Sequence, residues 1–180
     1  MAVATQDFTD ASSKTFVLVL SPTGEMLHEP IAVSMKAFAG AGNASLVLST
    51  LLFDSQSQKV ISAFGHENRL DLAQMLTVDL QNDKIIKTWT FEDFMISAGD
   101  QSATMNMEAE RVYLAGESDQ DAHIASFALS NGVPTGQHDL IKVDFDNSGE
   151  ESNSVVTHIF YEKDALFGAA EILDLPSETT

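Results

Sequence analysis

The chain has 180 residues, 44% of them hydrophobic and 20% charged, which is typical of a globular domain and unlike a disordered chain. It carries 9 Lys and Arg against 27 Asp and Glu, a formal net charge of −18, and the basic residues are spread singly from Lys14 to Lys163. Nucleic acids and anionic membrane surfaces bind clustered positive charge, so the composition argues against both as partners.

The ends of the chain and its apolar stretches bear on localisation. The first residues have neither the basic start nor the apolar run of a signal peptide. The apolar stretches 16–20 and 44–53 are too short to span a bilayer. We therefore expect a soluble protein, cytoplasmic by default. Residues 1–13 and 174–180 lack a periodic pattern and are expected to be loose tails on a single domain of residues 14–173.

Four apolar runs each lead through a turn rich in Gly, Ser, Asn, Asp or Pro into a second run, which is the pattern of a β-hairpin. In chain order the turns are residues 21–24, 54–58, 81–83 and 130–136. Around the third turn, Leu76, Val78 and Leu80 alternate with polar residues, which fits the strand period of two. The sequence predicts an all-β, or mainly β, fold of repeated antiparallel hairpins.

Three segments give a less definite pattern. Residues 68–75 and 162–173 fit either a strand or a helix, although Gly168 in the middle of a helix would cost about 1 kcal/mol relative to Ala. Residues 95–107, with three methionines, are predicted to form a loop or an irregular connection. Soft methionine side chains there would fill gaps in the core or line an adaptable contact surface.

Residues 111–116, Arg-Val-Tyr-Leu-Ala-Gly, followed by 123–136, resemble the second, third and fourth strands of a β-propeller blade of the lactonase or YVTN type. Residues 76–89 are similar to the outer hairpin of another blade, at a separation near the blade repeat of roughly 40 to 50 residues. The resemblance covers about half the chain and implies a propeller-like or partial-propeller fold. An irregular β-sandwich predicts similar strand spacing and is the alternative.

The segment 144–152 has the residue types of a calcium loop. Oxygen-bearing side chains at alternate positions precede Gly149, which allows a sharp turn, but Val155 stands where a helix-loop-helix calcium site has a bidentate Glu. The predicted ligands are Asp144, Asp146, Ser148 and Glu150. With so few protein ligands, we expect weak calcium binding completed by water. The competing interpretation is an ordinary acidic surface turn.

The histidines offer no local metal motif, since none of the five is spaced at i, i+3 or i+4 from another. Asp119, Asp121 and His123 lie close together in sequence, and His66 follows Gly65, so a site assembled in space is the alternative to ordinary strand histidines. The chain has no cysteine, no Gly-x-Ser-x-Gly motif and no phosphate-binding loop. No catalytic residue and no cofactor other than weakly bound calcium is therefore predicted.

These observations favour a non-enzymatic protein-binding or assembly module over an enzyme. Repeated hairpins that do not close on themselves leave open sheet edges, so we expect a homo-oligomer or a tight protein partner. The alternative is a lactonase-like hydrolase, whose polar site would gather carboxylates and histidines in a central channel. Convergence of His66, Asp119 or His123 in one cavity would favour that alternative.

Overall fold

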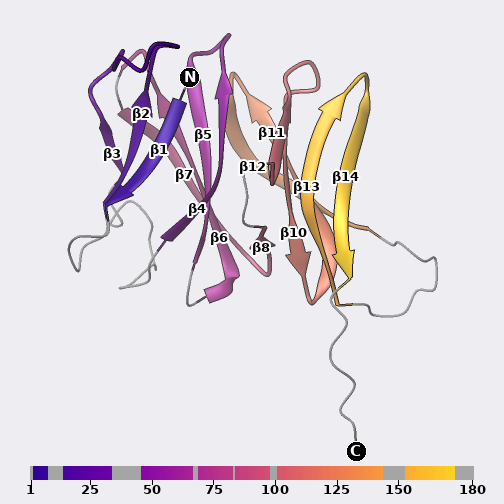
Figure 1. The fold of residues 1–180 in the computed structure, drawn as a ribbon. Coiled ribbons are helices and arrows are strands. Elements are labelled where there is room, and N and C mark those ends of the chain that lie inside the picture. The colour runs from indigo at the N-terminus through magenta and orange to yellow at the C-terminus, as the bar shows by residue number, and fades with distance from the viewer. Residues whose placement is uncertain are drawn as a thin grey trace, which may run out of the picture.

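The fold is all-β. The computed structural model describes residues 2–7, 14–33, 46–66, 69–82, 84–97, 101–143 and 153–172. Every regular element in these ranges is a β-strand, and every strand pair is antiparallel (Figure 1). The prediction of a mainly β fold is confirmed, whereas the propeller and sandwich alternatives both stay predictions.

The first half of the chain forms two sheets whose strands follow in sequence order. The first sheet contains β1 (Ala2–Asp7), β2 (Lys14–Val19) and β3 (Ile31–Val33). The second sheet contains β4 (Leu46–Asp54), β5 (Lys59–His66), β6 (Arg69–Asp79) and β7 (Lys84–Glu92). Within each of these two sheets, every strand pairs with the next one along the chain.

The second half forms two further sheets. The third sheet contains β8 (Met95–Ile96), β9 (Ala103–Asn106), β10 (Arg111–Ser118), β11 (Asp121–Ser130) and β12 (Val133–Lys142). Its order is β12-β11-β10, and both β8 and β9 pair with the far edge of β10. In the part of the chain that the structure describes, the fourth sheet consists of β13 (Ser154–Glu162) and β14 (Ala165–Ile172).

The structure decides the segments that the sequence left open. Residues 69–75 lie within β6, and 162–173 contain the end of β13, a two-residue turn and β14, so the helix interpretation of both is wrong. Lys163 and Asp164 both have positive φ, 49° and 64°, as a type I′ hairpin turn requires. The segment 95–107 contains the short strands β8 and β9, which pair with β10 in place of a fully irregular connection. Residues 2–7, where the pattern predicts no element, pair with β2 along their whole length.

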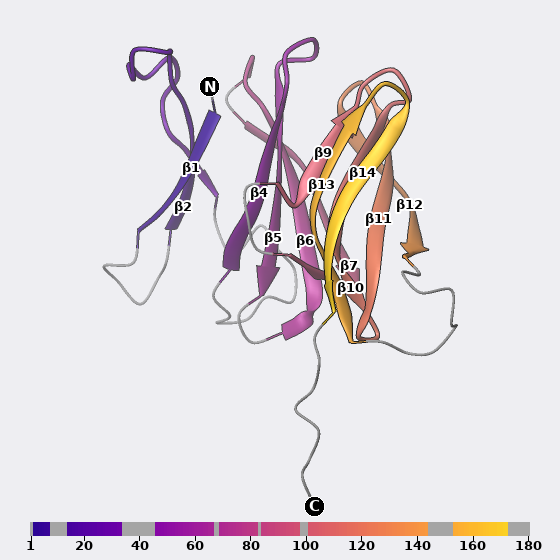
Figure 2. The ribbon, with the colours of Figure 1, turned by 45° about the vertical axis from the view of Figure 1, so that its right-hand side comes forward.

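The four sheets pack face to face in chain order, as the two views of the ribbon show (Figures 1 and 2). One apolar cluster, which includes Val17, Ile31 and Leu76, joins the first sheet to the second. A larger cluster between the second and third sheets includes Met75 and Phe127. A small third cluster joins the third sheet to the fourth. The two middle sheets are therefore covered on both faces.

Strand β10 shows how one strand serves two of these layers. Val112 and Leu114 belong to the cluster against the second sheet, while Ala115 belongs to the cluster against the fourth and Tyr113 packs on it. Successive side chains of a strand point to opposite faces, so this alternation places apolar groups in both layers. Full burial of one such Leu contributes roughly 1.5 to 3 kcal/mol.

The second and third sheets also share a turn design. The turns β4–β5 and β9–β10 each begin with a side chain that caps the turn. In the first, the Asp54 carboxylate accepts from the Gln56 amide at 2.8 Å. In the second, the Asn106 side-chain oxygen accepts from the Ala109 amide at 3.0 Å. Each turn ends in a residue with left-handed φ, which is Gln58 (54°) in the second sheet and Glu110 (49°) in the third. The Gln58 carbonyl accepts from the amide of Leu80, just after β6, at 3.1 Å. The Glu110 carbonyl accepts from the amide of Leu129, near the end of β11, at 2.6 Å.

Candidate functional sites

The predicted calcium ligands Asp144, Asp146, Ser148 and Glu150 lie outside the described residues, but both flanks of their segment are described. The amide of Val143 donates to the Ala122 carbonyl at 2.9 Å. On the other side, the Ser154 amide donates to the Gln120 carbonyl at 3.0 Å, and the Ser154 hydroxyl accepts from the Ala122 amide at 3.1 Å. Both flanks are thus fixed to the β10–β11 turn and the start of β11.

That turn carries the second predicted cluster, Asp119, Asp121 and His123. Asp119 is exposed and has φ of 51°, whereas Asp121 is only 8% exposed. The Asp121 carboxylate accepts from Lys142 Nζ at 2.5 Å, and His123 Nδ1 lies 2.9 Å from the Asp121 carbonyl oxygen. The buried carboxylate is engaged with a lysine and the imidazole with a backbone carbonyl, so these contacts are those of local structure.

The other histidines are dispersed over the described strands. His138 stacks on Phe127 with ring centroids 5.4 Å apart, and the exposed His158 has Nδ1 3.0 Å from the Thr157 hydroxyl. His66 ends β5, and its side chain is not described. Within the described ranges, no three His, Asp or Glu side chains are grouped so that they could hold a metal ion.

Two carboxyl groups have shifted pKa values for different reasons. The side-chain amide of Asn82 donates to Asp79 at 2.8 Å and, with the Gln81 amide, lowers the pKa of that carboxyl. Burial raises the pKa of the Glu117 carboxyl on β10. Alternation along β10 places Glu117 on the same face as Tyr113 and Ala115, which is the face that meets the fourth sheet. Glu117 is therefore a half-buried acid at a sheet interface.

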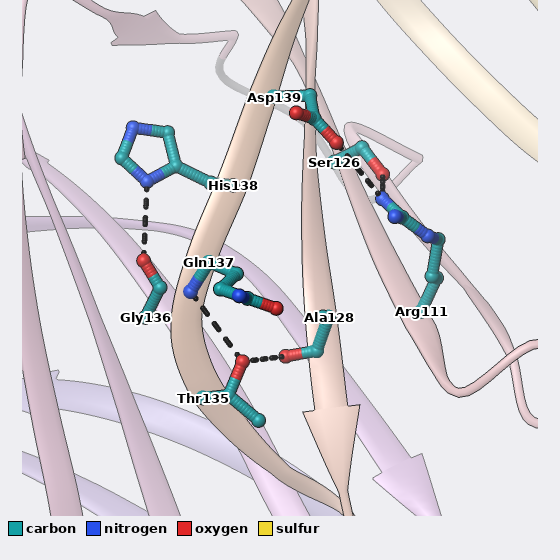
Figure 3. Close-up of polar contacts among 8 residues, drawn as sticks. All are labelled: Arg111, Ser126, Ala128, Thr135, Gly136, Gln137, His138 and Asp139. Carbon is teal, nitrogen blue, oxygen red and sulfur yellow. Dashed lines mark hydrogen bonds and ion pairs between the residues drawn. The ribbon is translucent and has the colours of Figure 1, made fainter.

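A polar strip crosses three strands of the third sheet (Figure 3). Arg111 on β10 donates from its Nη1 to the Ser126 hydroxyl on β11 at 2.6 Å and to the Asp139 carboxylate on β12 at 3.3 Å. Lower on β12, the Thr135 hydroxyl donates to the Ala128 carbonyl at 3.3 Å. The exposed Asp139 carboxylate makes this ion pair weak, since exposed pairs contribute about 0 to 1 kcal/mol. The strip holds β12 against its neighbours and leaves the guanidinium already paired.

Trp89, the only tryptophan, links the second sheet to β12. Its Nε1 donates to the Pro134 carbonyl at 3.0 Å, and its ring packs against the larger core cluster. A Cβ built on Gly136, whose φ is 94°, would lie only 2.4 Å from the Trp89 ring. Trp89 is thus a packing residue between two sheets, where its indole buries part of its large surface.

The feature that sequence reasoning missed is an apolar pair on the fourth sheet. Phe160 on β13 lies opposite Phe167 on β14, and their rings stack with centroids 4.9 Å apart. They are 53% and 46% exposed, while Val156 and Ile159 of the same sheet are buried against the third sheet. The pairing could have been read from the sequence only after the turn at 163–164 was recognised, because that turn sets the register.

The described ranges contain no helix with the length and hydropathy that a membrane crossing requires. When the chain is compared with known proteins, no family model, no curated protein and no solved structure matches it.

Proposed function

We propose that this chain is a protein-binding or assembly module built of stacked, propeller-like β-sheets. The observation that carries the proposal is the unequal cover of the sheets. The second and third sheets have an apolar layer on each face, whereas the fourth sheet has one only on its inner face, among the described residues. The middle sheets of this stack bury both faces, so the fourth sheet is suited to burying its second face against a partner.

The outer face of the fourth sheet has the chemistry of a contact surface. The side chains of Phe160 and Phe167 stand next to each other on it, and Ala169 lies on the same face by alternation. Aromatic residues are enriched at the cores of protein interfaces, where they bury large areas and charged residues are depleted. In a chain with net charge −18, an exposed aromatic pair is a surface that favours association.

The opposite end of the stack supports the same proposal. Val17 and Val19 of β2 face the second sheet, and the intervening Leu18 points to the other side and is half-buried. The connection after β2 exposes Met26 and Leu27, which are 62% and 57% exposed. Flexible thioether and aliphatic side chains of this kind adapt to a partner surface.

The proposal is tested by measuring the molar mass of the purified protein by light scattering from micromolar to millimolar concentration. We expect a mass above that of one chain, rising with concentration. The double variant Phe160→Ser/Phe167→Ser should weaken association by at least about tenfold, which corresponds to about 1.4 kcal/mol.

The matched control is Leu140→Ser/Ile141→Ser, which removes two apolar side chains of β12 that are 41% and 45% exposed. It should leave association nearly unchanged. A single-chain mass at every concentration would overturn the assembly proposal, and equal losses in the two double variants would overturn its placement on the fourth sheet.

A further inference from the structure

The edges of the sheets differ in how they are protected. An edge strand presents unpaired backbone groups, and proteins usually guard such strands with charges, proline, bulges or short length. Strand β7 carries Lys84, Lys87 and Glu92. Strand β12 carries Pro134, Asp139 and Lys142 and has a register shift opposite β11, and β3 has only three residues.

Strand β14 lacks these devices. Its sequence from Ala165 to Ile172 contains no proline and one ionisable residue, Glu171, next to its end. It pairs with β13 without a break from residue 165 to residue 172, and the register shift of that pair falls on β13, between Val156 and His158. The other apolar edge strand, β4, lies close to β1 and β9 and carries a register shift of its own. Strand β1, an edge of the first sheet, is shorter and ends in Gln6 and Asp7, so among the described strands β14 is the longest edge that is left unguarded.

Within the described ranges, β14 is the only edge at which the fourth sheet can grow. The other side of β13 is already engaged, because the Ile159 amide donates to the Gln101 carbonyl at 2.8 Å and the Tyr161 amide donates to the Thr104 hydroxyl at 3.2 Å. The Ala169 carbonyl accepts from the Thr157 hydroxyl of β13 at 3.2 Å, so the backbone of Ala169 faces β13. Backbone groups alternate in direction along a strand, and those of Gly168 and Ala170 therefore face the open edge.

We infer that β14 pairs with β14 of a second copy of this chain, antiparallel, so that two two-stranded sheets become one sheet of four strands. The inference rests on the proposed assembly function and names a second copy as the partner, which joins at the edge of the fourth sheet and extends its outer face without covering it. Pairing centred on Gly168 would place Phe167 beside Ala169 of the second copy and Leu166 beside its Ala170. Large side chains would then meet small ones on each face, and the exposed aromatic pairs of the two copies would form one apolar surface.

The low charge of β14 favours a second copy over a basic partner at this edge. The chain has a net charge of −18, so two copies repel each other over most of their surfaces. Along β14 the repulsion is reduced, because Glu171 is the only ionisable side chain of the strand. A basic protein or peptide would find more acidic surface elsewhere on the chain than along this edge. A short strand buries a small area, so we expect a dissociation constant in the micromolar range or weaker.

The decisive measurement is hydrogen exchange of the wild-type chain at low and high concentration, combined with sedimentation. Amides of β14 that face the open edge should become protected at high concentration, whereas those of the edge strand β12 should not change. Ala169→Glu adds a charge at an exposed position beside Phe167 of the second copy, and should weaken dimerisation by at least about tenfold. Gln137→Glu, the same charge change at an exposed position of β12, should leave it unchanged.

A wild-type chain that stays monomeric would overturn this inference and the self-assembly part of the proposed function. Association without protection of β14, or association that Ala169→Glu does not weaken, would overturn the β14 pairing and leave the assembly proposal standing. Protection of β14 in complexes that contain a different protein, with no dimer of the chain alone, would replace the second copy by another strand-donating partner. If Ala169→Glu fails to fold, the concentration dependence of exchange in the wild type decides the question.

Discussion

Strands β10 and β14 both carry apolar side chains and pair in type I′ hairpins, yet they are buried to different extents within the stack of sheets. Leu114 of β10 is fully buried between the second and third sheets, while Phe167 of β14 is 46% exposed. Strand β14 has more hydrophobic residues than β10, six of eight against four, so the lower burial of Phe167 comes from what lies on each face and not from composition. An apolar strand therefore stabilises the chain only where a second layer covers it, and elsewhere its apolar surface is available for a partner.

The largest contrast should come from truncating one side chain on each strand. Leu114→Ala removes a fully buried side chain and leaves a cavity, so we expect the free energy of unfolding to fall by about 2 to 5 kcal/mol. Phe167→Ala removes a half-exposed ring and should cost about 1 kcal/mol or less at concentrations where the chain is monomeric. Urea unfolding followed by circular dichroism measures both. Equal losses of unfolding free energy would mean that the fourth sheet is covered as completely as the third.

Two glycine-to-alanine substitutions, one on each strand, test the same contrast by adding a methyl group to the strand. A Cβ on Gly116 of β10 would lie 2.0 Å from the Met95 carbonyl oxygen and 2.8 Å from the Phe94 ring. Gly116→Ala must therefore push β8 away, and should cost roughly 1 to 3 kcal/mol or more. A Cβ on Gly168 of β14 would meet its nearest atom at 3.3 Å, so Gly168→Ala should change stability by less than about 1 kcal/mol. A mild Gly116→Ala would show that β8 is loosely held.

The contrast explains which parts of the fold the sequence could predict. Alternation and turn residues are local signals, and they identified the hairpins around residues 54–58, 81–83 and 130–136. They left 162–173 ambiguous because an apolar run with small residues fits two periods, and only the turn at Lys163 and Asp164 decides it. The packing of four sheets depends on contacts between distant segments, which periodicity does not encode.

The candidate sites divide in the same way. The Asp119–His123 cluster was visible because its members are neighbours in sequence, and the structure gives its contacts a local role. The apolar pair of Phe160 and Phe167 depends on hairpin register, and its exposure depends on the absence of a further layer among the described residues. Neither fact follows from residue type. The predicted calcium loop lies outside the described ranges and stays a prediction.

A smaller effect is expected where two sheets are joined by Trp89. Gly136 has φ of 94° and lies against the Trp89 ring, so Gly136→Ala combines backbone strain with a clash. We expect a loss of about 1 to 3 kcal/mol and a shift of the Trp89 fluorescence, since the ring must move. Gly24→Ala is the matched control, because Gly24 has φ of 88° but no atom of the described residues lies within 4 Å of its added Cβ. A loss in Gly24→Ala as large as in Gly136→Ala would assign the whole effect to backbone strain.

The smallest effect concerns Glu117, at the interface of the third and fourth sheets. Burial raises the pKa of this carboxyl in the folded state, so folding favours the protonated form. Stability is therefore lost as pH rises from the ordinary value of 4.5 through the folded-state pKa, and the loss persists at neutral pH. Glu117→Gln removes the ionisation, so the variant should melt at a slightly higher temperature than the wild type at neutral pH and no higher at acid pH. Glu92→Gln, at an exposed position of β7, controls for the general relief of negative charge. If both variants raise the melting temperature equally at neutral pH, the gain belongs to the net charge and not to the buried interface.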